Sequence, residues 1–259
     1  MSELSGMLWV EFRKAIRSRM PLWTSLGSLF LPIAIAFLLF VARNPDLSHK
    51  LGLVGEKANL VAYSGADWAA YFGLFTQMVS AGVFLLLVIS ISWVFGREFT
   101  DGTVKDLLAV PVRRSSILLA KFILIAVWAL LLTMVVIVSG FLMGALLHLP
   151  GGSASLFLEG SGRVLLTACL VLLVVFPFAF FASAGRGYLL PLGLAVLALL
   201  MANLAVVLGW GEVFPWSIPL LLAQAKEPTP QVSAWIVVLT GMAGMAATWL
   251  WWMKADQPH

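Results

Sequence analysis

The side chains of this chain that could do ionic chemistry gather in one short segment, residues 96–116, between two long apolar stretches. Seven residues of this segment are charged, whereas the flanking stretches carry almost no charge: Arg97, Glu98, Asp101, Lys105, Asp106, Arg113 and Arg114. Such a mixture forms ion pairs and docks charged partners. A structured, charged segment between two apolar stretches therefore predicts a site where a soluble partner acts mechanically on the membrane-buried part of the protein.

No part of the sequence predicts catalysis. His49, His148 and His259 are scattered and share no ligand spacing with Cys169, the single cysteine, so we expect this chain to hold no metal and no cofactor. No Ser-His-Asp grouping or pair of buried carboxylates indicates a hydrolase. We expect a protein that is not an enzyme.

The composition predicts an all-α polytopic membrane protein. Hydrophobic residues make up 61% of the 259 residues and charged residues 11%, whereas soluble domains are about 25% charged. The segments between apolar stretches are too short for a separate soluble domain, so one membrane domain should cover residues 1–259. Six stretches are long enough to span a bilayer, namely residues 22–42, 71–95, 117–147, 164–184, 188–209 and 232–253.

The distribution of cations predicts the direction of these spans. If the N-terminus lies inside, eleven of the sixteen Lys and Arg residues lie in cytoplasmic segments, as the positive-inside rule requires. Both termini should then be cytoplasmic. This sidedness also explains the net charge of +4, so we expect no nucleic-acid partner.

Residues 1–21 predict an amphipathic helix on the membrane surface. Met7, Ala15 and other apolar residues recur at helical spacing, and Glu11 and Lys14 belong to the polar side that we expect to face water and lipid headgroups. A basic tail that only orients the chain is an alternative role.

Within the charged segment, the sequence predicts a turn at residues 101–103 and then a helix of about two turns. Thr103 should cap this helix, Val104, Leu107 and Leu108 should share one face, and Pro111 should end it. Ser115 or Ser116 should cap the next span. The alternative is an ordinary solvated loop that supports the topology.

The run from Gly96 to Ile123 resembles the signature of the ATP-binding-cassette type-2 exporter permeases. That signature orders a basic-acidic pair, a Gly-Thr, two leucines, a proline, arginines and a lysine opening the next helix. This chain matches it with Arg97-Glu98, Gly102-Thr103, Leu107-Leu108, Pro111, Arg113-Arg114 and Lys121. The runs GRGYLLPLG (residues 185–193) and FPWSIP (residues 214–219) resemble segments of the branch that includes bacteriocin and peptide-antibiotic immunity permeases.

The resemblance implies a permease subunit of the bacterial inner membrane that pairs with a second copy or a relative and docks a separate cytoplasmic ATPase, which binds ATP and Mg²⁺. The chain has no G-x-x-x-x-G-K-[ST] motif of its own. Residues 210–231 would form a re-entrant external segment, and Trp216 there could equally be an interfacial anchor. The resemblance assigns ATPase coupling to Arg97, Glu98, Asp101, Gly102, Thr103, Lys105, Leu107, Leu108, Pro111 and Arg113, with a second contact at Arg186 and Gly187. Arg186 could instead be a lone topology-setting cation.

Polar residues inside the spans are mild. Gln77 and Asn203 could line a substrate path, or they could form hydrogen bonds between helices. Small residues at Gly140 and Gly144, and at Gly241 and Gly244, permit close helix approach, with packing inside one chain favoured over a dimer seam. A weakly polar, aromatic-rich interior would suit a hydrophobic or amphipathic cargo, such as a peptide antibiotic or a lipid-like molecule.

Two functions of different classes follow. The leading hypothesis is a transporter permease that exports such a cargo with energy from a partner ATPase. The alternative is a membrane scaffold or sensor that binds a cytoplasmic partner through residues 96–116 and transports nothing. A cofactor-bearing membrane enzyme is disfavoured because the spans lack paired histidines.

Overall fold

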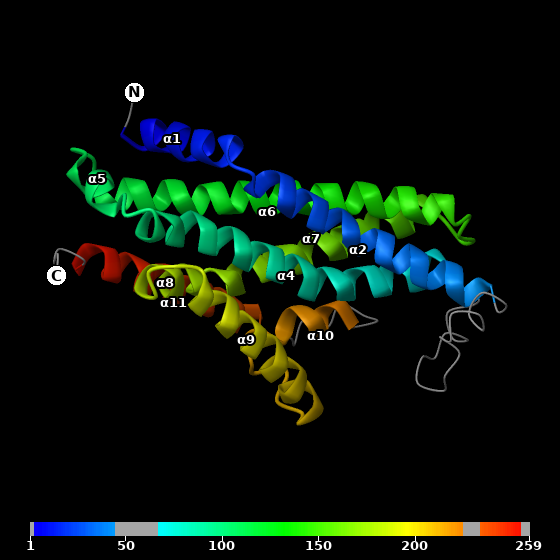
Figure 1. The fold of residues 1–259 in the computed structure, drawn as a ribbon. Helices are drawn as coiled ribbons and strands as arrows, with labels where there is room; N and C mark the ends of the chain where they lie inside the picture. Colours follow the sequence, from blue (N-terminus) through cyan, green and yellow to red (C-terminus); the bar gives the residue numbers. More distant parts are fainter. Residues whose placement is uncertain (1–2, 45–66, 225–233, 255–259) are drawn as a thin grey trace.

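The computed structural model describes residues 3–44, 67–224 and 234–254, apart from the side chains of Lys105 and Leu108. Every regular element in these ranges is a helix, which confirms the predicted fold class (Figure 1). The helices are α1 (Glu3–Arg17), α2 (Met20–Arg43), α4 (Trp68–Thr100), α5 (Val104–Ala109), α6 (Arg114–Leu146), α7 (Ala154–Val175), α8 (Pro177–Ala184), α9 (Leu189–Val207), α10 (Ile218–Gln224) and α11 (Ala234–Lys254).

Six helical segments are long and apolar enough to cross a membrane, and five of them start within about five residues of the predicted spans. They are α2, α4, α6, α7 together with α8, α9 and α11. The predicted start of the fourth span at residue 164 is wrong, because α7 begins at Ala154. The Ser153 hydroxyl accepts the backbone N–H of Leu156 at 3.2 Å, and Glu159 pairs with Arg163 four residues on. A cap and an ion pair of this spacing let the helix start in polar sequence.

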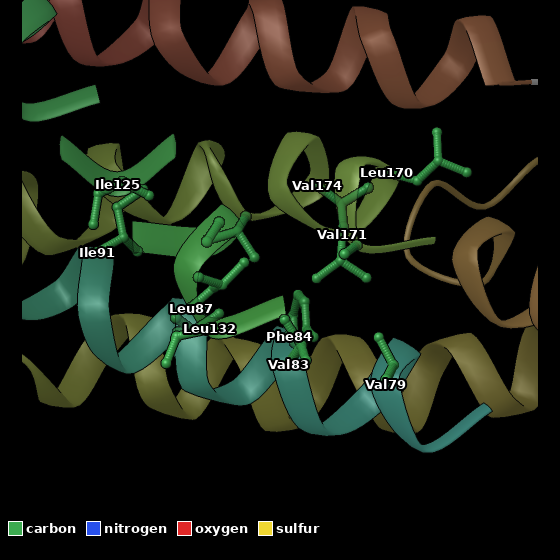
Figure 2. Close-up of a cluster of buried hydrophobic side chains, with 14 of the residues drawn as sticks. Val79, Val83, Phe84, Leu87, Ile91, Ile125, Leu132, Leu170, Val171 and Val174 are labelled. Carbon is green, nitrogen blue, oxygen red and sulfur yellow. The ribbon is translucent and has the colours of Figure 1, made fainter. Parts of the chain in front are cut away.

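The core forms around α4, which is apolar on all sides and is covered except along a face that includes Met78 and Ile89. It packs against α2, α6, α7, α8, α9 and α10. Figure 2 shows the middle of this core, where Val83 and Leu87 of α4 lie near Leu132 of α6 and Val171 of α7. Branched apolar side chains of this kind hold the bundle by close packing, because lipid provides little hydrophobic drive between helices.

Glycines set the closest helix contacts, and their neighbours lie within the same chain, as the favoured interpretation predicted. A Cβ added at Gly140 would lie 2.9 Å from a ring carbon of Phe75. At Gly241 an added Cβ would lie 3.0 Å from the carbonyl oxygen of Leu173, and at Gly244 it would overlap the backbone of Pro177. These contacts leave no space for larger residues where α6 meets α4 and where α11 meets α7 and α8.

Residues 211–224 fold back against the bundle. The indole N–H of Trp216 donates to the carbonyl oxygen of Val174 at 3.1 Å, and its ring packs against Phe178 and Phe214. Trp216 therefore anchors this segment to α7 and α8 through protein contacts. Residues 225–231 of the predicted re-entrant segment lie outside the described residues.

The start of α1 and the end of α11 lie at the same end of the bundle as α5 (Figure 1). The guanidinium of Arg114 donates to the carbonyl oxygens of Trp252 at 3.1 Å and Met253 at 3.2 Å. A cation at the carboxyl end of a helix satisfies carbonyls that have no partner within that helix. The start of α6 is thereby joined to the end of α11.

The glycine contacts predict opposite effects for two identical substitutions. Gly244→Ala should destabilise the protein by about 1–3 kcal/mol, because its Cβ meets backbone that cannot rotate away. Gly193→Ala, on the exposed face of α9 with nothing within 4 Å of the added atom, should stabilise the helix by about 0.5–1 kcal/mol. Thermal unfolding in detergent, followed by tryptophan fluorescence, measures both. Equal melting temperatures for the two variants would contradict this assignment.

Candidate functional site

The charged segment folds as a turn and a short helix, as predicted. After α4 ends, the backbone N–H of Asp101 donates to the carbonyl oxygen of Arg97 at 2.8 Å, and that of Thr103 to Glu98 at 2.9 Å. Gly102 has a φ of +71°, a conformation that favours glycine. The structure thus uses glycine where the chain turns from α4 into α5.

The caps of these helices differ from the predictions. Thr103 lies at the N-cap position of α5 but its side chain makes no capping hydrogen bond. The next helix begins at Arg114, so Ser115 and Ser116 lie inside it and cap nothing. Instead the backbone N–H of Arg113 donates to the carboxylate of Glu3 at 3.4 Å. A carboxylate from α1 replaces the local cap, which sequence spacing could not reveal.

Pro111 ends α5 as predicted. The last helical residue is Ala109, and Val110 has an extended backbone with a ψ of 135°, as expected immediately before proline. Lys105 and Leu108 belong to α5, but their side chains lie outside the described part of the structure. The predicted shared face of Val104, Leu107 and Leu108 therefore stays a prediction.

A small apolar cluster joins α5 to α1 and α6. Met7 of α1 is buried against Ile117 and Ala120 of α6, and Leu107 and Val112 of the charged segment pack on them. Because Leu107 also packs against the main core, α5 is held between both clusters. A six-residue helix is not stable alone, so these contacts fix its position.

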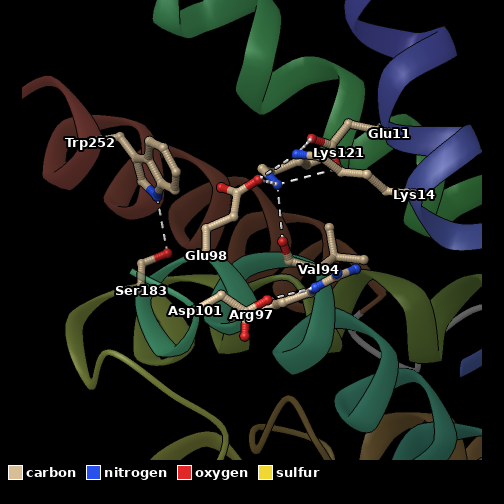
Figure 3. A network of polar contacts seen from close by, with 9 residues as sticks. All are labelled: Glu11, Lys14, Val94, Arg97, Glu98, Asp101, Lys121, Ser183 and Trp252. Carbon is tan, nitrogen blue, oxygen red and sulfur yellow. Dashed lines mark hydrogen bonds and ion pairs between the residues drawn. The ribbon is translucent and has the colours of Figure 1, made fainter. Parts of the chain in front are cut away.

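A buried ammonium lies directly beneath this cluster. Nζ of Lys121, in α6, lies 2.9 Å from Oε1 of Glu98 and 3.2 Å from Oε2 of Glu11. It also donates to the carbonyl oxygen of Val94 at 3.0 Å. Its side chain is 1% exposed, and its three protons have three acceptors from α1 and α4 (Figure 3).

Lys14 completes the network at its edge. Its ammonium lies 3.0 Å from Oε1 of Glu98 and 3.4 Å from Oε1 of Glu11, with 38% of the side chain exposed. Burial alone would lower the pKa of Lys14, but the Glu11 and Glu98 carboxylates outweigh it and raise that pKa above its ordinary value. The network thus balances two carboxylates with two ammonium groups.

Sequence reasoning missed this ion network, which we define as Glu11, Lys14, Glu98 and Lys121. Glu11 was expected on the solvated side of the first helix, yet it is 3% exposed. The sequence contains a signal of this burial, because Glu11 lies four residues from each of the buried residues Met7 and Ala15. A charge on an apolar stripe needs a buried partner of opposite charge.

A cavity of about 350 Å³ opens beside the network, between α1, α4, α5 and α6. At its edge, Nε of Arg97 pairs with Asp101 at 2.9 Å, and the guanidinium lies 5.0 Å from the centre of the Trp93 ring. Asp106 of α5 is exposed and lines the same cavity. Within the described residues, Oε2 of Glu98 is buried there without a hydrogen-bond partner.

The second predicted contact adjoins the first. The turn between α8 and α9 places Gly187 against the end of α4, where an added Cβ on Gly96 would lie 2.9 Å from the Gly187 carbonyl oxygen. Arg186, at the tip, is exposed and has a φ of +50°. Gly187 therefore lies beside the end of α4, which leads into the charged segment.

The two candidate substrate-path residues are not brought together. Gln77 lines a cavity between α4, α7 and α10. Asn203 lies on the exposed face of α9, where its amide donates to the carbonyl oxygen of Leu199 at 2.8 Å in the same helix. The amide of Asn203 thus bonds within its own helix, and the alternative of a hydrogen bond to another helix is not found among the described residues.

Removing the buried ammonium should cost far more than removing the exposed one. Lys121→Met leaves two carboxylates short of a partner, so the free energy of unfolding should fall by about 3–5 kcal/mol. Lys14→Met, in the same network but partly exposed, should cost no more than about 1 kcal/mol. Thermal unfolding in detergent measures both variants. If the two variants lose the same free energy of unfolding, burial does not determine how much each ammonium group stabilises the protein.

Comparison with known proteins bears on this arrangement. The model of the ABC-2 family transporter proteins matches residues 7–203, which include α1, the ion network, α5 and the turn at residues 185–188. The bacitracin transport permease protein of Bacillus licheniformis is 28% identical over 168 residues, which cover 64% of this chain and 81% of that protein. The chain therefore belongs to the ABC-2 transporter family and is a multi-pass membrane permease subunit of an ABC exporter.

Proposed function

We propose that α5 and the turn at residues 185–188 form the surface on which a separate cytoplasmic ATPase acts, and that the buried ion network supports α5 from beneath. The observation that carries this proposal is the buried Lys121 ammonium, which joins α1, α4 and α6 directly beneath α5. The ATPase binds ATP and Mg²⁺, and this chain contributes no ATPase site. The permease contributes a rigid connection between the ATPase and the membrane helices.

The contacts of α5 explain how force would pass through it. A push on α5 reaches α4 through the bond between the Thr103 amide and the Glu98 carbonyl oxygen, and reaches α1 and α6 through Leu107. The Glu98 side chain is itself bound to Lys121 and Lys14. Moving α1, α4 or α6 against the other two would separate buried charges from their partners, which is costly. A force that α5 passes to one of these helices is therefore shared by all three.

The proposed setting is the inner membrane of a bacterium, with α5 and both termini on the cytoplasmic side. The excess of Lys and Arg in the segments at that end supports this orientation, and so does the position of the start of α1 and the end of α11 at the same end as α5. The exposed side of α1 carries Trp9, Arg13 and Ile16, a composition suited to the lipid interface. A second permease copy or a relative completes the transporter.

The proposed cargo is an amphipathic peptide antibiotic, moved out of the membrane or the cell. The relative named as a bacitracin transport permease supports this class. The proposal extends to bacitracin itself as the first compound to test, because the match covers most of that relative's length.

Two substitutions, each of which replaces an exposed carboxylate with arginine, test the docking surface. Asp106→Arg, on the exposed side of α5, should remove the ATPase from the complex and abolish bacitracin resistance in cells that express both subunits. Glu212→Arg is the matched control, since Glu212 is exposed in the turn after α9 and far from α5 along the fold. Pull-down from detergent extracts measures association, and the minimal inhibitory concentration measures transport.

Each outcome has a distinct meaning. Loss of both readouts only in Asp106→Arg supports the coupling surface. An ATPase that stays bound and active with Asp106→Arg contradicts it. An ATPase that binds native permease while no peptide antibiotic is tolerated better would favour the scaffold function over transport.

A further inference from the structure

A second cavity, of about 440 Å³, lies toward the end of the bundle opposite to α5. It is formed by the first turns of α4, the first turns of α7 and the end of α10. Its polar lining consists of Gln77, Glu159, Arg163 and Gln224, and its apolar lining includes Phe72 and Leu156. A mainly apolar cavity with a few convergent polar groups, within about 300–1,000 Å³, is typical of ligand sites.

The apolar wall of this cavity is rigid. Phe72 is buried and packs against Trp68 at 5.8 Å and Phe157 at 6.2 Å between ring centres. Gly160 lets α7 approach so closely that an added Cβ would lie 2.7 Å from the Phe72 ring. The wall is therefore shaped before any ligand arrives, which lowers the entropic cost of binding.

The polar lining matches the chemistry of a peptide. Two primary amides, on Gln77 and Gln224, each offer donors and an acceptor, as a peptide backbone requires. Glu159 lies 3.4 Å from Arg163 and its side chain is 70% exposed. An exposed pair of this kind is weak, so the carboxylate can accept a cation from a ligand.

We propose that this cavity, between α4, α7 and α10, binds an amphipathic peptide with at least one cationic group, whose apolar side chain packs on Phe72 and whose cation meets Glu159. The inference rests on the proposed function, because it names where the cargo of that transporter is recognised. An anionic headgroup of a lipid could pair with Arg163, but Glu159 is the more exposed of the two charges, 70% against 24%, and would repel the phosphate. The experiment separates these two ligands.

Gly73 offers a way to fill the cavity without damaging the fold. It lines the cavity, and an added Cβ there has no atom within 4 Å. Gly162 of α7 is equally open but lies on an exposed face outside the cavity. Gly73→Leu therefore blocks the proposed site, and Gly162→Leu is a matched control with the same change in side chain and in helix propensity.

The purified complex with its ATPase, in lipid nanodiscs, gives the first measurement. The peptide antibiotic of the resistance assay should stimulate ATP hydrolysis by the native complex and by Gly162→Leu. It should fail to stimulate Gly73→Leu. Stimulation of Gly73→Leu as strong as native would overturn the inference and leave the proposed function standing. A native complex that no peptide antibiotic stimulates would contradict the proposed function itself.

Thiol protection gives a second measurement that does not depend on ATP hydrolysis. In a Cys169→Ala background, which removes the single native thiol, Gly73→Cys and Gly162→Cys each introduce one site for a maleimide reagent. The peptide should slow labelling at position 73 at least threefold and leave position 162 unchanged. Equal labelling rates at position 73 with and without peptide would contradict binding in this cavity.

Glu159→Gln separates the two ligand classes. It should weaken protection by the cationic peptide about threefold, as expected for an exposed ion pair. If the cavity instead prefers a phosphate headgroup, vesicles rich in phosphatidylglycerol should protect position 73 of the protein that retains Glu159 at least as well as the peptide does. That result would overturn the peptide assignment.

Discussion

The arrangement of this permease depends on the burial of one ammonium group. Lys121 is almost fully excluded from solvent, and a buried cation is tolerated only when opposite charge and hydrogen-bond acceptors surround it. Two helices other than its own supply them, through Glu11 of α1 and through Glu98 and Val94 of α4. Any shift of one helix against the other two would lengthen a charged contact. One side chain therefore fixes the relative positions of α1, α4 and α6 beneath α5.

Local rules explain which parts of the fold the sequence could predict. The spans follow from apolar length, and the end of α5 follows from the steric effect of Pro111 on Val110. The early start of α7 depends on Ser153 and on the pair of Glu159 with Arg163. A hydropathy average counts these polar residues against a membrane-spanning helix. At a helix cap, or as an ion pair four residues apart, the same residues favour a helix.

The site was harder to predict because its partners are far apart in the chain. Glu11 and Lys121 are separated by 110 residues, and no spacing rule pairs charges over that distance. What the sequence offered was one charge on an apolar stripe of α1 and one lysine at the start of a long apolar span. Either charge alone favours an interfacial position. Only together do they neutralise each other inside the protein.

The middle of α4 and its end at Glu98 resist movement in different ways, and a transporter can use this difference. The helix has 33 residues and is therefore about 50 Å long, of which about 30 Å separates Gln77 at the cavity from Glu98 in the ion network. Apolar contacts along its middle, such as Val83 against Val171, have no preferred direction and tolerate small sliding. The charged contacts at Glu98 are short and directional, so they do not. In the proposed mechanism, a displacement imposed at the network is carried along α4 to the far cavity, where Gln77 moves with the helix.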